Sequence, residues 1–276
     1  MKNKNRLGDN FLKAIIWMLS FITIGFLIWI LLYIFIKGLP HISLRFLTSP
    51  NNSKNDGIFP MIYNTFFIVL ASLAISVPLG IGAAIYLVEY SKPSKTIKVI
   101  KAVRFAVETL SGIPSILFGL FGLIFFVTIL KFGFSILAGA LTLSIMVLPT
   151  IIRTTEEALK SVPDSYREGS FALGATKLIT IKKIILPSAI PGILTAVILS
   201  IGRIVGETAA VYLTAGMGRN IASGFMDSGR TLSVHLYILA KEGISFDKAY
   251  ATAAVLIIII AIINMTASGL ATRMKK

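Results

Sequence analysis

Two charged residues, Arg203 and Glu207, interrupt an otherwise apolar run from residue 187 to about residue 215. A guanidinium is a planar fork of N–H donors that suits the oxygens of an oxyanion. Residues four apart lie on one face of a helix, so the spacing predicts that the two side chains can pair. A carboxylate that competes for the guanidinium would keep anion binding weak enough for release. We interpret Arg203 as a transient anion contact and Glu207 as its counter-ion or gate. The alternative is a structural ion pair that locks this segment against residues 105–130.

A second candidate is the break Gly112-Ile113-Pro114-Ser115, which interrupts the apolar run 105–130. Broken helices expose backbone amides that can face an anion, so Gly112 and Ser115 join the candidate substrate path. A proline kink with tight glycine packing is the simpler alternative, and we favour it as the main role.

Two further features of the same run indicate packing rather than chemistry. Glu108 follows Arg104 by one turn, which predicts an ion pair near the membrane surface. Gly119 and Gly122 predict a close approach between helices.

Several patterns that carry chemistry are absent from the sequence. No Gly-x-x-x-x-Gly-Lys-Ser/Thr phosphate loop occurs, so we expect no ATP hydrolysis by this chain. Neither His-Glu-x-x-His nor Gly-x-Ser-x-Gly occurs, and the chain has no cysteine. The two histidines, His41 and His235, are too far apart to suggest a metal site. His235 falls in a segment, 230–241, that is apolar enough for a surface or re-entrant helix, and we expect it to be solvated or packed.

The composition indicates an all-α polytopic membrane protein. Of the 276 residues, 55% are hydrophobic and only 14% are charged, and the mean hydropathy is +0.85. A bilayer-spanning helix needs about 20 apolar residues. Six runs meet or approach that length: 14–36, 61–88 with Pro78-Leu79-Gly80 as a kink, 105–130, 132–152 after a tight turn around Lys131, 187 to about 215, and 249–270.

The net charge of +15 is explained mostly by topology. Six spans place both termini on one side. The connections on that side, with the termini, carry 18 of the 27 Lys and Arg residues, whereas the opposite connections carry 8. The positive-inside rule therefore predicts cytoplasmic termini and removes the reason to expect nucleic-acid binding.

A polar segment, residues 153–187, separates the fourth and fifth runs on the predicted cytoplasmic side. We expect short helices at 156–160 and 163–168, the latter with Pro163 in its first turn, and a stop at Gly174. Apolar residues at helical spacing then predict a new helix over 175–185. Short helices are marginal in water, so the segment predicts a soluble partner; an apolar face lying on the membrane surface is the alternative.

The spacing within this segment resembles the cytoplasmic signature loop of ABC importer permeases. From Glu168 the sequence reads Glu-Gly-Ser, three residues, Gly174, nine residues, Ile184, one residue and Leu186-Pro187. The family pattern is Glu-Ala-Ala, three residues, Gly, nine residues and Ile-x-Leu-Pro. Gly169 and Ser170 depart from its two alanines but remain small.

The resemblance implies a type I (MetI-like) permease fold and a set of partners. The runs 112–122 and 202–209 are similar to the phosphate-importer branch, and the order of the chain resembles its PstA-type permeases. These features imply import of inorganic phosphate together with a PstC-type second permease, two ATPase subunits that use ATP and Mg, and an external phosphate-binding protein. No cofactor is implied for this chain. The residues implied to couple to the ATPases are Arg167, Glu168, Gly169, Ala172, Gly174, Ile184, Leu186 and Pro187.

The sequence predicts three regions: 1–60 as an N-terminal tail, first membrane helix and external loop, 61–271 as a permease core, and 272–276 as a cytoplasmic tail. Two alternatives stay open. One is a permease for another oxyanion, such as phosphonate, sulfate or molybdate. The other is an ion-coupled secondary carrier, which the docking loop and the absence of evident internal repeats argue against.

Overall fold

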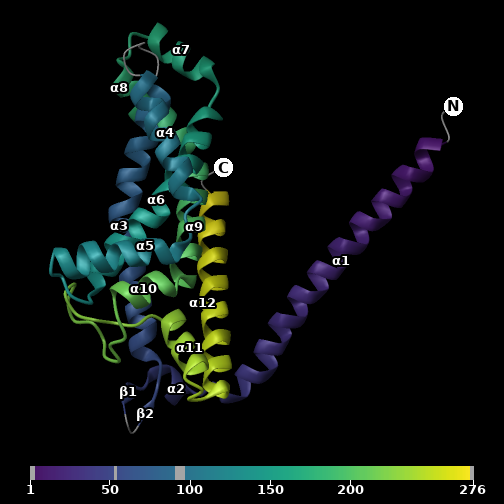
Figure 1. Cartoon of the computed structure of the whole chain (residues 1–276). Helices are drawn as coiled ribbons and strands as arrows, with labels where there is room; N and C mark the ends of the chain where they lie inside the picture. The colour runs from purple at the N-terminus through teal and green to yellow at the C-terminus, as the bar shows by residue number, and fades with distance from the viewer. Residues whose placement is uncertain (1–3, 53–54, 91–96, 274–276) are drawn as a thin grey trace.

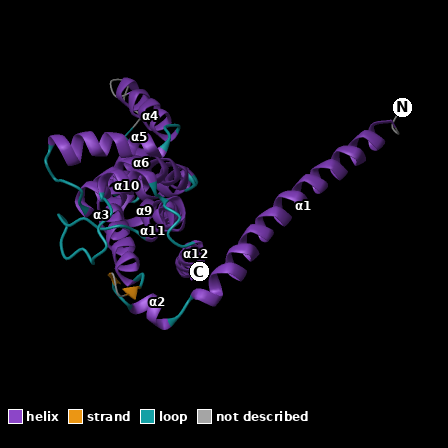
Figure 2. Cartoon of the chain, turned by 60° about the horizontal axis from the view of Figure 1, so that its bottom comes forward, coloured by secondary structure: helices purple, strands orange, loops and turns teal. Residues whose placement is uncertain are grey.

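The computed structural model describes residues 4–52, 55–90 and 97–273 of the chain. The molecule is a bundle of long helices from which one helix, α1, leaves at an angle (Figures 1 and 2). Within these described residues, five helices are long and apolar enough to cross a membrane. A bent pair, formed by α4 and by α5 with its π-helical continuation, makes a sixth span if the pair is counted as one. This agrees with the all-α polytopic prediction. Lys92 and Lys95, in the basic connection 89–104 between the second and third predicted spans, lie outside the described residues, as do the last three residues of the predicted tail 272–276.

The elements follow one another in this order: α1 (Lys4–Gly38), a 3-10 turn (Leu39–His41), α2 (Leu44–Thr48), β1 (Asn51–Asn52), β2 (Asn55–Asp56), α3 (Phe59–Glu89), α4 (Ile97–Ser111), α5 (Ser115–Gly122), a π-helix (Leu123–Ile129), α6 (Ile136–Lys160), α7 (Asp164–Ala172), α8 (Lys177–Thr180), a second π-helix (Ile181–Ile185), α9 (Leu186–Gly206), α10 (Ala209–Thr214), α11 (Leu232–Lys241) and α12 (Phe246–Arg273). The two strands form a small antiparallel hairpin.

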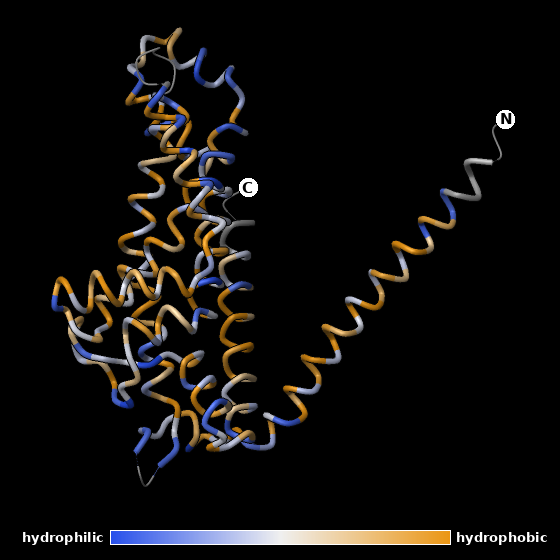
Figure 3. The backbone as a smooth tube through the Cα atoms, in the orientation of Figure 1, coloured by the Kyte–Doolittle hydropathy of each residue, from blue (hydrophilic) through white to orange (hydrophobic). Residues whose placement is uncertain are grey.

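The bundle has two polar ends (Figure 3). We call the end that carries α7 and α8 the α7 end and the opposite one the β1–β2 end. The start of α1 and the end of α12 both lie toward the α7 end (Figure 1). The most hydropathic part of α1 is unburied, so its apolar side chains face outward along the span.

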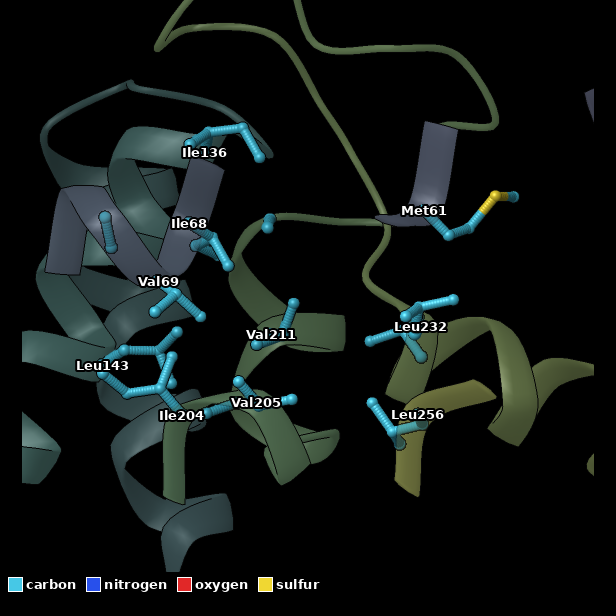
Figure 4. Close-up of a cluster of buried hydrophobic side chains, with 14 of the residues drawn as sticks. Met61, Ile68, Val69, Ile136, Leu143, Ile204, Val205, Val211, Leu232 and Leu256 are labelled. Carbon is cyan, nitrogen blue, oxygen red and sulfur yellow. The ribbon is translucent and has the colours of Figure 1, made fainter. Parts of the chain in front are cut away.

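The core lies where α3, α6, α9, α10, α11 and α12 meet (Figure 4). Its largest side chains include Met61 and Ile68 of α3, Leu143 of α6, Ile204 of α9 and Leu232 of α11. Buried hydroxyl groups in these helices bond the carbonyl one turn earlier, as Ser72 does to Ile68 at 2.7 Å, and so remain satisfied in an apolar setting. Ser144 of α6 adds a bond between helices, to the Ser72 carbonyl at 3.0 Å.

Two spans differ from the sequence prediction. The predicted third span, 105–130, is bent by 103° between α4 and α5, so α5 runs across the bundle instead of along it (Figure 1). The predicted fifth span, 187–215, begins earlier and ends earlier: one helical run extends from Lys177 to Gly206, and α10 is a separate helix. The second predicted span is a single helix, because α3 continues through Pro78 without a break.

Smaller sequence predictions are confirmed. The turn before α6 includes Lys131 and Gly133, both with positive φ (55° and 64°). Gly119 lies so close to α10 that an added Cβ would stand 2.8 Å from the Cα of Ala210. An added Cβ on Gly122 would stand 2.1 Å from the Thr142 hydroxyl oxygen, so both glycines do allow close helix approach.

Candidate functional site

Arg203 lies in the last turn of α9 and is half-buried. Its Nη1 donates to the Thr150 hydroxyl of α6 at 3.4 Å, a long bond to a neutral group. Among the described residues, Arg203 forms no ion pair with a carboxylate. A charge in a membrane span costs about 2.5–3.5 kcal/mol on insertion scales, so such a guanidinium normally faces protein or a water-filled cavity. Arg203 therefore retains donors for an anion.

Glu207 does not lie on the helical face of Arg203, so the predicted pair of neighbours on one helix is wrong. The chain leaves α9 at Glu207, whose φ of −71° and ψ of 127° are extended. Its Oε1 accepts from the backbone N–H of Ala210 at 3.2 Å, and its carbonyl accepts from the Ser233 hydroxyl at 2.7 Å. The first amides of a helix lack partners and attract negative charge, so the start of α10 holds this carboxylate.

Gly112 and Ser115 flank the sharp break between α4 and α5. Gly112 is exposed and Ser115 is half-buried. A bend of 103° exceeds an ordinary proline kink, so the favoured sequence interpretation is corrected here. The break turns α5 toward α10, where Ile116, Thr208 and Tyr237 help line an apolar groove of about 540 Å³.

The predicted pair between Glu108 and Arg104 is also wrong. Arg104 pairs instead with Glu156 of α6, at 2.6 Å, and Lys160 approaches the same carboxylate oxygen to 2.7 Å. Glu156 is 52 residues from Arg104 in sequence, so only the packing of α4 on α6 brings the two together.

The polar segment 153–187 forms an arm at the α7 end (Figure 1). The predicted helix 156–160 is the end of α6, not a separate helix. Pro163 precedes α7 as its N-cap residue instead of lying in the first turn. Gly174, with φ of +79°, ends this stretch as predicted, and the next helix begins at Lys177.

The arm presents an exposed surface that combines charge with apolar side chains. Of the predicted coupling residues, Glu168, Gly169, Ala172, Gly174 and Pro187 are exposed. Beside them Leu173 is 90% exposed, and Tyr166, Phe171, Leu178 and Ile179 are exposed as well. Exposed apolar groups gathered at a polar end indicate a docking surface. We call these residues of α7, α8 and the turn between them the docking surface.

Three of the predicted coupling residues have inward contacts. Ile184 and Leu186 are half-buried and pack on an apolar cluster that joins the ends of α3 and α6 to α9. Arg167 is only 13% exposed and pairs at 2.8 Å with Glu89, the last residue of α3. Glu89 was missed by sequence reasoning. Its position, as the acidic first residue of the basic connection 89–104, was the one available signal.

His235 and Arg230 lie near the β1–β2 end, in and just before α11. Both are buried, and each has a nitrogen without a hydrogen-bond partner in the described structure: Nδ1 of His235 and Nε of Arg230. Burial, followed by the positive charges of Arg230 and Arg219, lowers the pKa of His235 to about 3. His235 is thus packed, one of the two states expected for it, and the apolar segment 230–241 does form a short helix. The described residues contain no group of three or more His, Cys, Asp or Glu that could hold a metal ion.

Comparisons with known proteins agree with this architecture. Residues 76–276 match the family described as binding-protein-dependent transport system inner membrane component. The probable ABC transporter permease protein YqgI of Bacillus subtilis (strain 168) is 32% identical over 98% of this chain and 97% of its own length. The phosphate transport system permease protein PstA 1 of Mycobacterium tuberculosis (strain CDC 1551 / Oshkosh) is 37% identical over 77% of this chain and 69% of its own.

A solved structure shares the fold at low sequence identity. The structure of a bacterial alginate ABC transporter in complex with an alginate pentasaccharide-bound periplasmic protein contains a chain that is 20% identical to this one. It has a TM-score of 0.65 and covers 100% of this chain and 96% of its own. At this identity the likeness defines the fold alone.

Proposed function

The chain belongs to the family of binding-protein-dependent transport system inner membrane components, and on that premise we propose that it is a permease subunit that carries inorganic phosphate into the cell. ATP is hydrolysed by a separate ATPase subunit. Membership in this family sets aside the ion-coupled secondary carrier. The chain is a multi-pass membrane protein, and we propose that both termini and the α7 end face the cytoplasm, in accord with the excess of Lys and Arg on that side.

The observation that carries the phosphate assignment is the half-buried Arg203, which lacks a carboxylate partner among the described residues. Its guanidinium can offer a pair of parallel N–H donors to a phosphate oxygen pair. The description of the M. tuberculosis relative as a phosphate permease supports the same cargo. Glu207 contributes by holding the start of α10 beside the path, not by competing for Arg203.

The docking surface supports the proposed partners. Glu168 and the exposed apolar residues around Leu173 are available to a soluble ATPase subunit at the α7 end. The continuous helical run from Lys177 to Gly206 joins this surface to Arg203. At 1.5 Å per residue, Lys177 at the start of this run and Arg203 lie about 39 Å apart along the helix. We propose a complex of this chain with a PstC-type permease, two ATPases and an external phosphate-binding protein.

The test is transport by the co-purified complex in proteoliposomes. Phosphate-loaded binding protein should stimulate ATP hydrolysis and uptake more than sulfate- or molybdate-loaded protein does. Arg203→Ala should lower phosphate uptake at least about tenfold, because a hydrogen bond to a charged group contributes about 1.5–3 kcal/mol. Arg153→Ala, which removes an exposed arginine of α6, is the matched control. Normal uptake by Arg203→Ala at normal expression would contradict the role of Arg203, and stimulation by sulfate alone would replace phosphate with another oxyanion.

A further inference from the structure

Glu89 is a buried carboxylate at the point where α3 meets the arm. Its side chain is only 8% exposed, and its Oε1 accepts from Nε and Nη2 of Arg167 at 3.1 and 2.8 Å. A buried charge is retained only where it is paired and hydrogen-bonded, so this geometry holds Glu89 and Arg167 together. The contact joins residues 78 apart in sequence.

Arg167 also closes the turn between α6 and α7. It donates to the carbonyls of Leu159 and Val162 at 3.0 and 2.9 Å and to the exposed carboxylate of Asp164 at 3.1 Å. One guanidinium therefore binds the end of α6, the start of α7 and the end of α3. These bonds leave only 13% of the Arg167 side chain exposed.

A second contact, from α8, holds the same residue of α3. The Lys177 ammonium donates to the backbone carbonyl of Glu89 and lies 4.4 Å from the centre of the Tyr90 ring. The buried hydroxyls of Ser170 and Thr180, 2.8 Å apart, tie α7 to the end of α8. The two halves of the arm thus hold α3 as one unit.

The other end of α3 is fixed to the loop before α11. Asn64 accepts from the backbone N–H of Ala222 at 2.9 Å and donates to the Asn220 carbonyl at 3.0 Å. Glu89 follows Asn64 by 25 positions, so the two are about 37 Å apart along the helix axis. α3 is unbroken between these two attachments, so it is a direct mechanical link between the arm and the β1–β2 end.

We propose that Glu89 is the contact through which a movement of the arm is transmitted to α3. The inference rests on the proposed function, in which ATPase subunits bind the docking surface. When they move α7 and α8, Arg167 and Lys177 carry the end of α3 with them, and Asn64 transmits the motion to the loop 216–231 on the opposite side. Glu89 and Arg167 are positioning residues and do not touch the cargo.

The experiment uses the whole complex in proteoliposomes with Glu89→Gln, which keeps the size of the side chain and removes its charge. We expect assembly with the ATPases and basal ATP hydrolysis to stay within about twofold of wild type. Stimulation by loaded binding protein, and anion imported per ATP hydrolysed, should each fall at least about fivefold, the lower range for coupling between sites. Glu108→Gln, the same change at an exposed carboxylate of α4, should alter neither quantity.

A charge exchange tests the pair itself. Glu89→Arg combined with Arg167→Glu should recover part of the stimulation that either single substitution removes. If Glu89→Gln failed to assemble, Lys177→Gln would decide instead, because it removes the second contact without burying an unpaired charge; it should lower stimulation in the same direction. If loaded binding protein stimulated ATP hydrolysis as much as in wild type in an assembled Glu89→Gln complex, or in Lys177→Gln, the proposed role of Glu89 would be wrong.

The cargo is read separately, from the anion that stimulates the wild-type complex. If only sulfate-loaded binding protein stimulated the wild-type complex, the phosphate assignment would be wrong. The role of Glu89 would then be tested by sulfate-dependent stimulation in the same variants.

Discussion

Glu207 follows Arg203 by four residues, yet its carboxylate turns to the backbone N–H of Ala210 while the guanidinium of Arg203 reaches Thr150 on α6. The residue that the spacing offered as a counter-ion instead holds the beginning of α10. This difference changes what substitutions at the two positions should do.

Replacing Glu207 should affect stability as well as transport. Glu207→Ala leaves the Ala210 amide without its acceptor, and the loss of such a helix-start contact costs about 1 kcal/mol, or about 2–4 °C in Tm. Glu207→Gln keeps an acceptor oxygen and should lie between Ala and wild type in thermal unfolding. Phosphate uptake should fall less in Glu207→Gln than in Arg203→Ala. A tighter apparent affinity for phosphate in Glu207→Gln would instead restore the counter-ion role.

The Arg104–Glu156 pair should hold α4 on α6. Glu156→Gln leaves Arg104 and Lys160 without their shared carboxylate, so α4 should open more often. The chain has no cysteine, so a single cysteine in place of the half-buried Val103 can report the opening by maleimide labelling. The labelling rate should rise at least about threefold, as expected for a small loss of local stability. Glu157→Gln, at the neighbouring exposed carboxylate, is the control, and an equal rise there would count against the pair.

Substitutions at two glycines of α3 should distinguish the effect of close helix packing from the effect of helix propensity. A Cβ on Gly80 would stand 2.5 Å from Cγ2 of Ile151 on α6, whereas one on Gly82 would meet nothing within 4 Å. Gly80→Ala should therefore destabilise the protein by about 1–3 kcal/mol through overpacking. Gly82→Ala should leave Tm unchanged or raise it slightly, because alanine favours helix. Thermal unfolding of the purified protein compares them, and equal Tm values would show that α3 and α6 can separate at no cost.

His235 should make the protein sensitive to acid. Its pKa is lowered to about 3, so the folded state stays neutral at pH values where an unfolded chain takes up a proton. The contribution of His235 to the free energy of unfolding is then complete above the ordinary histidine pKa of about 6.5. It decreases as the pH drops from 6.5 toward 3, by up to about 1.4 kcal/mol per pH unit. α11, with 10 residues, is too short to span the bilayer, and it lies toward the polar β1–β2 end of the bundle (Figure 1).

His235→Gln should reduce the difference in Tm between pH 7.5 and pH 5. His41→Gln, at the exposed histidine, should keep the wild-type difference. If His235→Gln lost as much stability in acid as wild type does, another group would be responsible.

The sequence alone determined the class of the protein, its apolar runs and the arm at 153–187. Lipid offers no hydrogen bonds, so each span must satisfy its backbone within its own helix, and a local run of apolar residues is enough to reveal it. Turn chemistry is similarly local, which is why Gly174 and Lys131 were predictable.

Only the tertiary structure decided the partners of the charged residues and the path of the broken span. Local spacing suggested Glu207 for Arg203 and Glu108 for Arg104, and both pairs were wrong. Arg104 and Arg167 instead bind Glu156 and Glu89, which lie 52 and 78 residues away. Such partners depend on how helices pack, because a buried guanidinium pairs with the carboxylate that helix packing places beside it. The spacing of residues along one helix does not show which residues of other helices will lie next to it.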